Sequence, residues 1–335
     1  MWRTAVDRVL RPAGLVFAGL AVMFVLAQQG LAEETSIRVA VPHHGAAEWE
    51  METIRNHSLD VENGVALKVV STEYQNATIS ALREREVDMI IGNWIWVSRA
   101  RAEGERFAFM PFSQGAGTLL KAPGAGIETI EDLRGKRLGV ANSPREISWL
   151  MIRGLVLQER GFDLRDEAEI VYGEPGLLEQ RFAEGMLDAV VTKWGFAERL
   201  EANGMERILD AQEAARLLGA ERRVALLGFI FRDDWAEANR EAVLGLLEAS
   251  RQAKSLLRES DEAWEPLRDL MDVEDEETFE AMKRSYRAAI PRKWGAAERG
   301  EARVLFETLA KLGGEEFVGM NSALEPGTFW SPARY

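Results

Sequence analysis

The sequence contains no cysteine among its 335 residues and only three histidines. The lack of cysteine excludes disulfides, thiolate metal sites, a cysteine nucleophile and a lipid carried on cysteine. With so few histidines and no H-E-x-x-H pattern, the sequence predicts neither a metal site nor a cofactor. No Ser-His-Asp constellation or glycine-rich phosphate loop stands out, so we expect a protein that is not an enzyme.

The chain also lacks an apolar run long enough to cross a bilayer. The charge-free stretch Ala13–Ala27 spans about 15 residues, short of the roughly 20 that a membrane helix needs. It follows three arginines and precedes the small residues Gly30 and Ala32. This order is typical of a secretory signal peptide, so we expect cleavage after Ala32 and a periplasmic, soluble mature protein. A membrane anchor is the alternative reading of this run.

Positive charge is in the minority, with 41 basic against 55 acidic residues and a formal net charge of −14. Removal of residues 1–32 takes away three arginines and one aspartate, which leaves −16. A chain this acidic is a poor ligand for nucleic acid and stays in solution, so we expect no nucleic-acid partner and a monomer. The hydrophobic content of 47% is enough for more than one core.

Two stretches about one hundred residues apart share one pattern of a short β run, a polar loop, a helix with a tryptophan, a second β run, a helix and a third β run. The best match is between Val87–Trp94 and Leu187–Trp194. Strands that alternate with helices predict an α/β fold whose parallel sheets bind ligands beyond the carboxyl ends of their strands. Two such sheets facing each other would form a cleft. We read Asp88 and Asp188 as residues of strand junctions.

The pattern changes near Leu227, from where a short strand leads into helices. We predict an export signal at 1–32, a first lobe from 33–120 plus 228–335 with C-terminal helices, and a second lobe at 121–227. The chain would cross between lobes near 119–123 and 226–229. Later helices are predicted at 276–290 and 302–312, the last one ended by Gly313 and Gly314.

The stretch Ile130-Glu131-Asp132-Leu133-Arg134-Gly135-Lys136-Arg137-Leu138-Gly139-Val140 resembles a signature of the second lobe in binding proteins of ABC importers. The residues around Asp88 and Asp188 resemble paired turns of the same family. The resemblance covers roughly residues 36–270 and is closest to the group that binds sulfonates, taurine, nitrate and thiamine-pyrimidine-like compounds. It implies a two-lobed type II periplasmic-binding fold that closes on its ligand and delivers it to an inner-membrane permease with its ATPase.

The loop Asn142-Ser143-Pro144-Arg145 is the first candidate for a ligand site. Asn142 or Ser143 suits a helix N-cap and Pro144 suits the first turn, so the free N–H groups beyond could hold an anion. The resemblance implies contact between this loop and an acidic group of the ligand. An ordinary cap without a ligand is the alternative.

Aromatic and charged residues gather near the predicted strand ends. Trp94, Trp96 and Trp194 could wall a flat or apolar ligand, or belong to the core. Arg99, Arg101, Arg145 and Lys193 could pair with a carboxylate or sulfonate, or be solvated. Other candidates for polar contact are His43, His44, Tyr74, Gln75, Asn93, Gln114 and Glu174.

These features favour a protein that captures a small anion with a flat or apolar part for an ABC importer. A sulfonate, an aromatic carboxylate and pyrroloquinoline quinone fit this description. A periplasmic sensor or scavenger would have the same cleft. Relatives of this fold that are enzymes act in the synthesis of a thiamine pyrimidine, with a cysteine-rich segment, or of menaquinone, in the cytosol.

Overall fold

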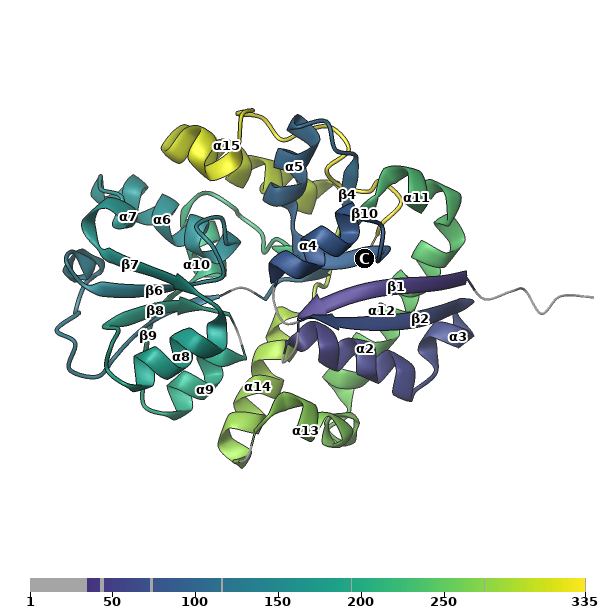
Figure 1. The fold of residues 1–335 in the computed structure, drawn as a ribbon, viewed down its shortest axis with the longest axis horizontal. Helices are drawn as coiled ribbons and strands as arrows, with labels where there is room; N and C mark the ends of the chain where they lie inside the picture. The colour runs from purple at the N-terminus through teal and green to yellow at the C-terminus, as the bar shows by residue number, and fades with distance from the viewer. Residues whose placement is uncertain are drawn as a thin grey trace, which may run out of the picture.

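The computed structural model describes residues 35–42, 45–72, 75–115, 117–193, 195–273 and 275–334. They form two α/β lobes, each built on a five-stranded sheet, on opposite sides of the molecule (Figure 1). Two facing α/β sheets are what the repeated strand pattern predicts, and two lobes are what the family resemblance implies. Among the described residues, no helix is long and apolar enough to cross a membrane. The predicted signal at 1–32 lies outside the described residues.

The first lobe has a mixed sheet with one inserted strand. Its order is β2 (Val65–Thr72), β1 (Thr35–Pro42), β3 (Met89–Asn93), β10 (Leu227–Arg232) and β4 (Phe107–Ser113). Strand β1 is parallel to β2 and β3, whereas β10 is antiparallel to β3 and β4. Helices on this sheet are α2 (Ala46–Asn56), α3 (Leu59–Glu62), α4 (Gln75–Arg83) and α5 (Trp94–Ala102).

The second lobe repeats this arrangement. Its order is β7 (Glu169–Gly173), β6 (Arg137–Ala141), β8 (Ala189–Thr192), β5 (Thr118–Lys121) and β9 (Glu206–Asp210). Here β5 is the inserted antiparallel strand. Its helices are the 3₁₀ helix η1 (Ile130–Leu133), α6 (Ile147–Arg160), α7 (Leu164–Glu167), α8 (Pro175–Ala183), α9 (Phe196–Ala202) and α10 (Ala211–Leu217).

The aspartates of the two repeats have the same structural role. Asp88 accepts hydrogen bonds from the Nε, Nη2 and main-chain N–H groups of Arg38, at 3.0, 2.7 and 2.8 Å. Asp188 accepts the same three from Arg137, at 3.1, 2.7 and 2.8 Å. Each aspartate thus ties the start of a third strand to the first strand of the same repeat, which confirms that both are junction residues.

The chain crosses between the sheets twice, and each crossing supplies the inserted strand of the sheet that it enters. The first crossing lies between β4 and β5, at residues 114–117, a few residues before the predicted 119–123. The cause is that Leu119 and Leu120 already pair with β8 and β9 inside the second sheet.

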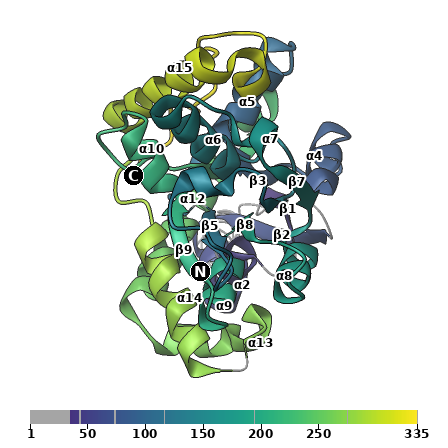
Figure 2. The same ribbon diagram turned by 90° about the vertical axis from the view of Figure 1, so that its left-hand side faces the viewer.

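The C-terminal part is helical and packs on both lobes. Its helices are α11 (Asp233–Ala238), α12 (Arg240–Glu259), the 3₁₀ helix η2 (Glu262–Leu267), α13 (Arg268–Met271), α14 (Glu276–Ala289) and α15 (Ala296–Val318). Helix α14 packs against α9 of the second lobe, and α15 packs against both α5 and α6. In Figures 1 and 2, α15 lies along one side of the molecule and α14 along the opposite side.

The two glycines interrupt the last helix at the point where the sequence predicts that it ends. Gly314 has a non-helical backbone (φ 54°, ψ −140°), but helical turns continue to Val318. The two glycines therefore produce a kink, because Gly314 can take a positive φ without a steric penalty.

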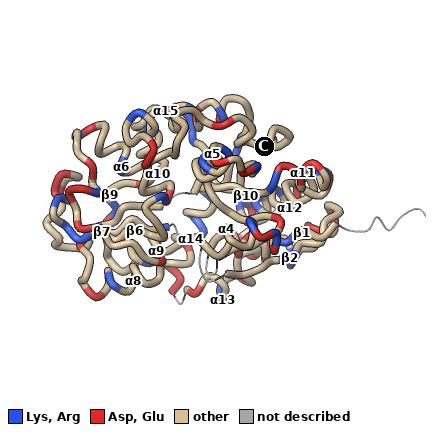
Figure 3. Tube along the Cα trace, turned by 45° about the horizontal axis from the view of Figure 1, so that its top comes forward, with Lys and Arg blue, Asp and Glu red and all other residues tan. Residues whose placement is uncertain are grey.

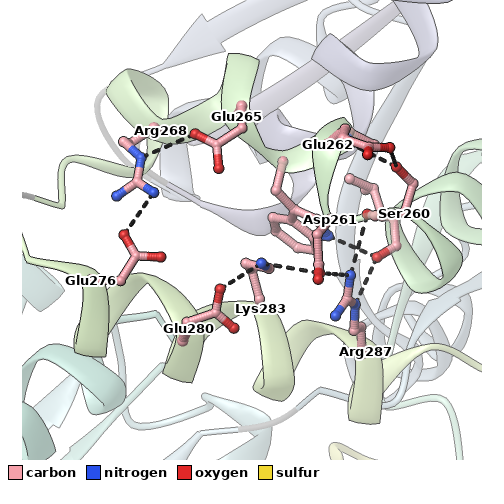
Figure 4. Close-up of polar contacts among 12 residues, drawn as sticks. Ser260, Asp261, Glu262, Glu265, Arg268, Glu276, Glu280, Lys283 and Arg287 are labelled. Atoms are coloured by element: carbon pink, nitrogen blue, oxygen red, sulfur yellow. Dashed lines mark hydrogen bonds and ion pairs between the residues drawn. The ribbon is translucent and has the colours of Figure 1, made fainter.

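An ion-pair network fixes the hairpin of η2, α13 and α14 (Figure 4). Asp261 accepts from Lys283 at 3.1 Å and from Arg287 at 2.7 Å, and these hydrogen bonds lower its pKa. On the other side, Arg268 bridges Glu265 and Glu276. The network sets the position of the α13–α14 turn, which reaches the space between the lobes.

Candidate functional site

A cavity of about 810 Å³ lies between the two lobes. In the first lobe it is lined by residues at the ends of β1 and β3 and at the starts of α2 and α4. In the second lobe it is lined by residues that follow β6, β7 and β8. The carboxyl ends of the parallel strands of both sheets thus open into one space, as the strand-end rule predicts. Asp272, at the turn after α13, completes the rim.

The structure brings nine of the sixteen candidate site residues to this cavity. They are Gln75, Asn93, Trp96, Arg99, Asn142, Ser143, Arg145, Glu174 and Lys193. Four others, His43, His44, Tyr74 and Trp194, lie outside the described residues. The last three, Trp94, Gln114 and Arg101, are described and lie elsewhere.

Trp94 belongs to the core and not to the cavity wall. Its side chain is fully buried and packs on Phe306 and Phe329, with ring centroids 6.5 and 6.2 Å away. Trp96, two residues later, does line the cavity and stacks on Phe107 at 5.2 Å.

Gln114 lies in the first crossing and holds the crossing segments together. Its side-chain amide donates to the carbonyl of Arg223 in the second crossing at 3.3 Å. Its own carbonyl accepts from Gln212 at 2.7 Å. These contacts give Gln114 a structural role between the two crossing segments.

Arg101 also has a structural role, because it is held by three partners away from the cavity. It donates to the carbonyls of Pro326 and Phe107 and forms an ion pair with Asp233 at 2.8 Å.

The helix after β6 begins three residues later than predicted. Its N-cap is Glu146, whose carboxylate accepts from the N–H group of Trp149 at 3.0 Å and from the Ser148 hydroxyl at 3.2 Å. Ser143 instead accepts from the N–H of Arg145 within the loop, at 3.3 Å. A carboxylate of the chain thus occupies part of the helix terminus where the sequence predicts a bound anion.

Asn142 has an unusual backbone for its residue type. Its φ of 64° lies in the left-handed region, which asparagine tolerates better than most residues. Its main-chain N–H donates to the carbonyl of Gly173 at 2.7 Å, which joins the ends of β6 and β7. Its side-chain oxygen is buried and has no partner among the described residues.

Lys193 carries a positive charge into the floor of the second lobe. Its ammonium has no hydrogen bond or ion pair with any described residue, although Glu146 and Glu174 lie near enough to affect it electrostatically. Burial lowers the pKa of Lys193, and the two carboxylates oppose this effect. Burial also raises the pKa of Glu146 and of Glu174, and Lys193 counteracts both shifts. The three groups therefore form one electrostatically coupled set.

Two arginines from different lobes approach each other across the cavity. Arg99 lies on α5 of the first lobe, and Arg145 lies in the loop before α6 of the second. Burial lowers the pKa of Arg99, and the charge of Arg145 lowers it further. Neither arginine forms an ion pair with a described carboxylate; Arg99 donates only to the carbonyls of Glu316 and Phe317, both at 3.2 Å. Within the described chain the two cations thus lack a direct ion pair, although Glu103, Glu315 and Glu316 lie near enough to Arg99 to oppose the lowering of its pKa.

The other two arginines of the lining have carboxylate partners. Arg83 forms a bidentate pair with Glu105, with a shortest contact of 2.6 Å. Arg199 pairs with Glu179 at 3.0 Å. The side chains of Lys193, Arg99 and Arg145 therefore supply the unpaired positive charge of the described lining.

Apolar side chains form much of the first-lobe wall, beside the polar residues Gln75, Asn76, Ser80 and Asn93. The apolar ones are Ile79, Ile90, Ile91, Ile95, Phe112, Leu227 and Ile230. The second lobe adds Ile147 and Phe196. The cavity therefore combines charged groups with a large apolar area, which together suit a molecule with an ionic head and an apolar body.

Sequence reasoning missed several lining residues. Glu146 follows Arg145 directly, and Phe196 and Arg199 follow Lys193 on the next helix, so an extension of each strand-end loop by one helical turn would have found them. The signal was absent for Phe112 and Ile230, which lie inside strands and reach the cavity only because the sheet edge faces it.

The described residues contain no cluster of three or more His, Asp or Glu side chains able to hold a metal ion. Figure 3 shows acidic and basic residues spread over both lobes. The cavity differs from this background, because its lining has five basic and four acidic residues in a chain with a net charge of −14.

Comparison with known proteins places these features in a family. The model of the family described as NMT1/THI5 like matches residues 61–263. A search of curated proteins gave no match.

Among solved structures, the alkanesulfonate-binding protein SsuA from Xanthomonas axonopodis pv. citri, bound to MOPS, is similar with a TM-score of 0.70 and 19% identity. The match covers 90% of this chain and 99% of that protein. The periplasmic aliphatic sulphonate-binding protein SsuA from Escherichia coli gives a TM-score of 0.70 and 17% identity over 89% of this chain and 92% of that one. The nitrate-binding protein NrtA from Synechocystis PCC 6803 gives 0.60 and 12% over 76% and 70%.

Proposed function

This chain belongs to the NMT1/THI5-like family, and from that premise we propose that it is the solute-binding component of an ABC importer, specific for a small organic anion. Similar structures include proteins named as binding sulfonates or nitrate. The protein would act in the periplasm as a monomer and pass its ligand to a permease with its ATPase.

The main support for an anionic ligand is a set of three cations that have no ion-pair partner in the described part of the chain. Lys193, Arg99 and Arg145 line one cavity without an ion-pair partner among the described residues. Lys193 and Arg99 are partly buried, and a partly buried charge without an ion-pair partner is costly until a ligand of opposite sign binds, whereas Arg145 is exposed and adds positive charge at the rim. A sulfonate or carboxylate offers each cation an oxygen acceptor, with arginine suited to bidentate contact.

Cavity size and the apolar wall support an organic anion rather than a small inorganic one. About 810 Å³ is within the range of sites for organic molecules, so nitrate alone would leave most of it to water. An alkyl chain or a flat ring could lie against the isoleucines and Phe112 of the first lobe while its acidic group faces the second. Alkanesulfonates, aromatic carboxylates and pyrroloquinoline quinone have this build.

Calorimetric titration with a chosen panel tests the proposal. The panel should contain ethanesulfonate, hexanesulfonate, naphthalenesulfonate, naphthoate, pyrroloquinoline quinone, nitrate and the cation hexyltrimethylammonium. We expect binding of at least one organic anion, an affinity that rises with apolar area, and none of the cation. Tight binding of the cation, or of nitrate alone, would contradict the assignment.

Two further measurements test location and transport. Expression of the full chain in a Gram-negative host should give a protein that osmotic shock releases, with Glu33 at its N-terminus; retention of Met1 in the membrane fraction would contradict export. Uptake of the best ligand by native cells should fall when the gene is deleted. Unchanged uptake would favour a sensor or scavenger.

A further inference from the structure

The last turn of α15 contacts both lobes, beside the cavity. The kink at Gly314 changes the direction of the chain, and the carbonyls of Glu316 and Phe317 then accept hydrogen bonds from Nη1 of Arg99, each at 3.2 Å. Arg99 belongs to the first lobe and lines the cavity. The main chain of this turn therefore helps to hold a ligand-facing side chain.

The side chain of Glu316 points the other way, to the second lobe. Its carboxylate accepts from Nη2 of Arg153 at 2.8 Å and from Nη1 of Arg165 at 2.6 Å. Arg153 is fully buried in α6 and is also fixed by Asp163 at 2.8 Å. Burial alone would lower the pKa of Arg153, but its bonds to Asp163 and Glu316 raise it.

Tight packing makes the turn sensitive to movement on either side. Gly319 has a φ of 90°, and a Cβ atom there would lie 2.9 Å from Cγ of Arg99. At Gly154 of α6, a Cβ atom would lie 2.6 Å from a methyl group of Leu309 in α15. Glycines thus let α15 approach both α5 and α6 closely, so that the two lobes meet on one short segment.

We propose that Glu316 is a positioning residue that couples anion binding at Arg99 to the closure of the two lobes. The proposal rests on the proposed function, because it concerns the same cavity. Arg99 forms no ion pair with a described carboxylate and is repelled by Arg145 of the opposite lobe, although Glu103, Glu315 and Glu316 act on it at longer range. An anion between them removes that repulsion and draws Arg99 toward the second lobe. Glu316 transmits this displacement because its carbonyl holds Arg99 while its carboxylate holds Arg153 and Arg165.

The chain offers a matched control for this role. Glu315 is exposed and carries the same charge near Arg99, but it has no side-chain bond to either lobe. Glu316→Gln and Glu315→Gln therefore change the net charge equally, and only the first removes the ion pairs to the second lobe. Glu316→Asp serves as the conservative variant that should recover part of the coupling.

The measurement is the distribution of distances between the lobes by pulsed electron spin resonance. Because the chain has no cysteine, labels can be attached only where they are wanted, through Val61→Cys in the first lobe and Met186→Cys in the second, both at least half exposed. Samples are taken without ligand and with hexanesulfonate. We expect Glu316→Gln to broaden the distribution of distances between the lobes in the absence of ligand, and hexanesulfonate to narrow this distribution less than in the parent. The distance distributions of Glu315→Gln should be the same as those of the parent.

A double-mutant cycle separates coupling from a merely structural role. In the parent, we expect Glu316→Gln to weaken hexanesulfonate binding about fivefold or more, where fivefold is the lower end of the usual range for coupling between two sites. In a protein that already carries Arg99→Ala, we expect Glu316→Gln to have almost no further effect on this binding. Additive effects, or distance distributions of Glu316→Gln and Glu315→Gln that coincide, would overturn the proposal. If the parent binds no organic anion, the proposed function fails, while the ligand-free distributions still test the link between the lobes.

Discussion

Replacement of Lys193 by methionine removes the positive charge at the floor of the second lobe and keeps most of the side-chain volume. In the free protein the ammonium has no described hydrogen-bond partner, and burial lowers its pKa. The substitution removes the cost of a buried ammonium but also its attraction to Glu146 and Glu174, and because these two effects oppose each other the stability of the free protein should change little. Any large loss should appear only in binding.

A hydrogen bond to a charged group contributes about 1.5–3 kcal/mol, which is roughly 10- to 150-fold in Kd. The upper part of this range is expected for an anion, because the substitution leaves Glu146 and Glu174 without an opposing charge. Both would then repel the ligand across a cavity of low dielectric constant. Hexanesulfonate should thus bind to Lys193→Met about a hundredfold more weakly than to the parent.

Calorimetry at several pH values can test the role of the ammonium. The pKa of Lys193 lies below its ordinary value in the free protein, and a bound anion should raise it, because the anion favours the charged form. Affinity should therefore fall as the pH rises through the pKa of the free protein, with proton uptake on binding in that range. Lys193→Met should lack both effects.

Lys311→Met is the control for the change in net charge, since Lys311 is exposed on α15 and away from the cavity lining. Its affinity should equal that of the parent. If the two variants bind hexanesulfonate equally well, Lys193 does not contact the anion and the reasoning from the unpaired ammonium is wrong.

Two further outcomes follow from the structure. Trp94→Ala should lower the free energy of unfolding by about 3–5 kcal/mol, as for other buried large aromatic residues, with little change in hexanesulfonate affinity; a large loss of affinity at unchanged denaturation midpoint would return Trp94 to the site. For Asp163, burial would raise the pKa, but the bonds from Arg153 and the N–H of Arg165 lower it overall. Its contribution to stability is therefore present above the pKa of the unfolded chain and lost as the pH falls through the folded value. Asp163→Asn should flatten the thermal stability profile between about pH 3 and 5, and an unchanged slope would argue against this ion pair.

The two-lobed fold could be predicted because the sequence contains the same pattern twice. Each copy has an apolar third strand preceded by an aspartate, and both aspartates bind an arginine in the first strand of their repeat. Strand β4 had no such signal. All its residues from Phe107 to Ser113 are buried, so no alternation of polar and apolar residues marks it as a strand.

The site was predicted less completely, and the two tryptophans after β3 show why. The rule that ligands bind beyond strand ends selects Trp94 and Trp96 equally. Helix α5, however, begins at Trp94 without an intervening loop. Residues two apart on a helix are about 200° apart around its axis, so one points to the core and the other to the cavity. The residue at which helix α5 starts therefore decides which of the two tryptophans lines the cavity.

The same difficulty affected the loop before α6. Ser143 and Glu146 have the spacing of a capping box, which would make Ser143 the N-cap. Asn142 takes a left-handed backbone instead, and Glu146 becomes the cap. The choice depends on Asn142 N–H bonding to Gly173, a contact between two strands that a local pattern does not contain.

Charge pairing is the property of the cavity that depends most on tertiary structure. Arg83 and Arg199 are neutralised by glutamates about 20 positions away in sequence, on neighbouring elements. Lys193 and Arg145 lie in loops at strand ends and form no ion pair with a described carboxylate, although Glu146 and Glu174 act on Lys193 at longer range. Arg99 lies on helix α5, and main-chain carbonyls hold it in place of a carboxylate. The strand-end rule therefore selects the location of a ligand and two of the three cations that remain free to bind it, whereas Arg99 depends on the packing of α15 against α5.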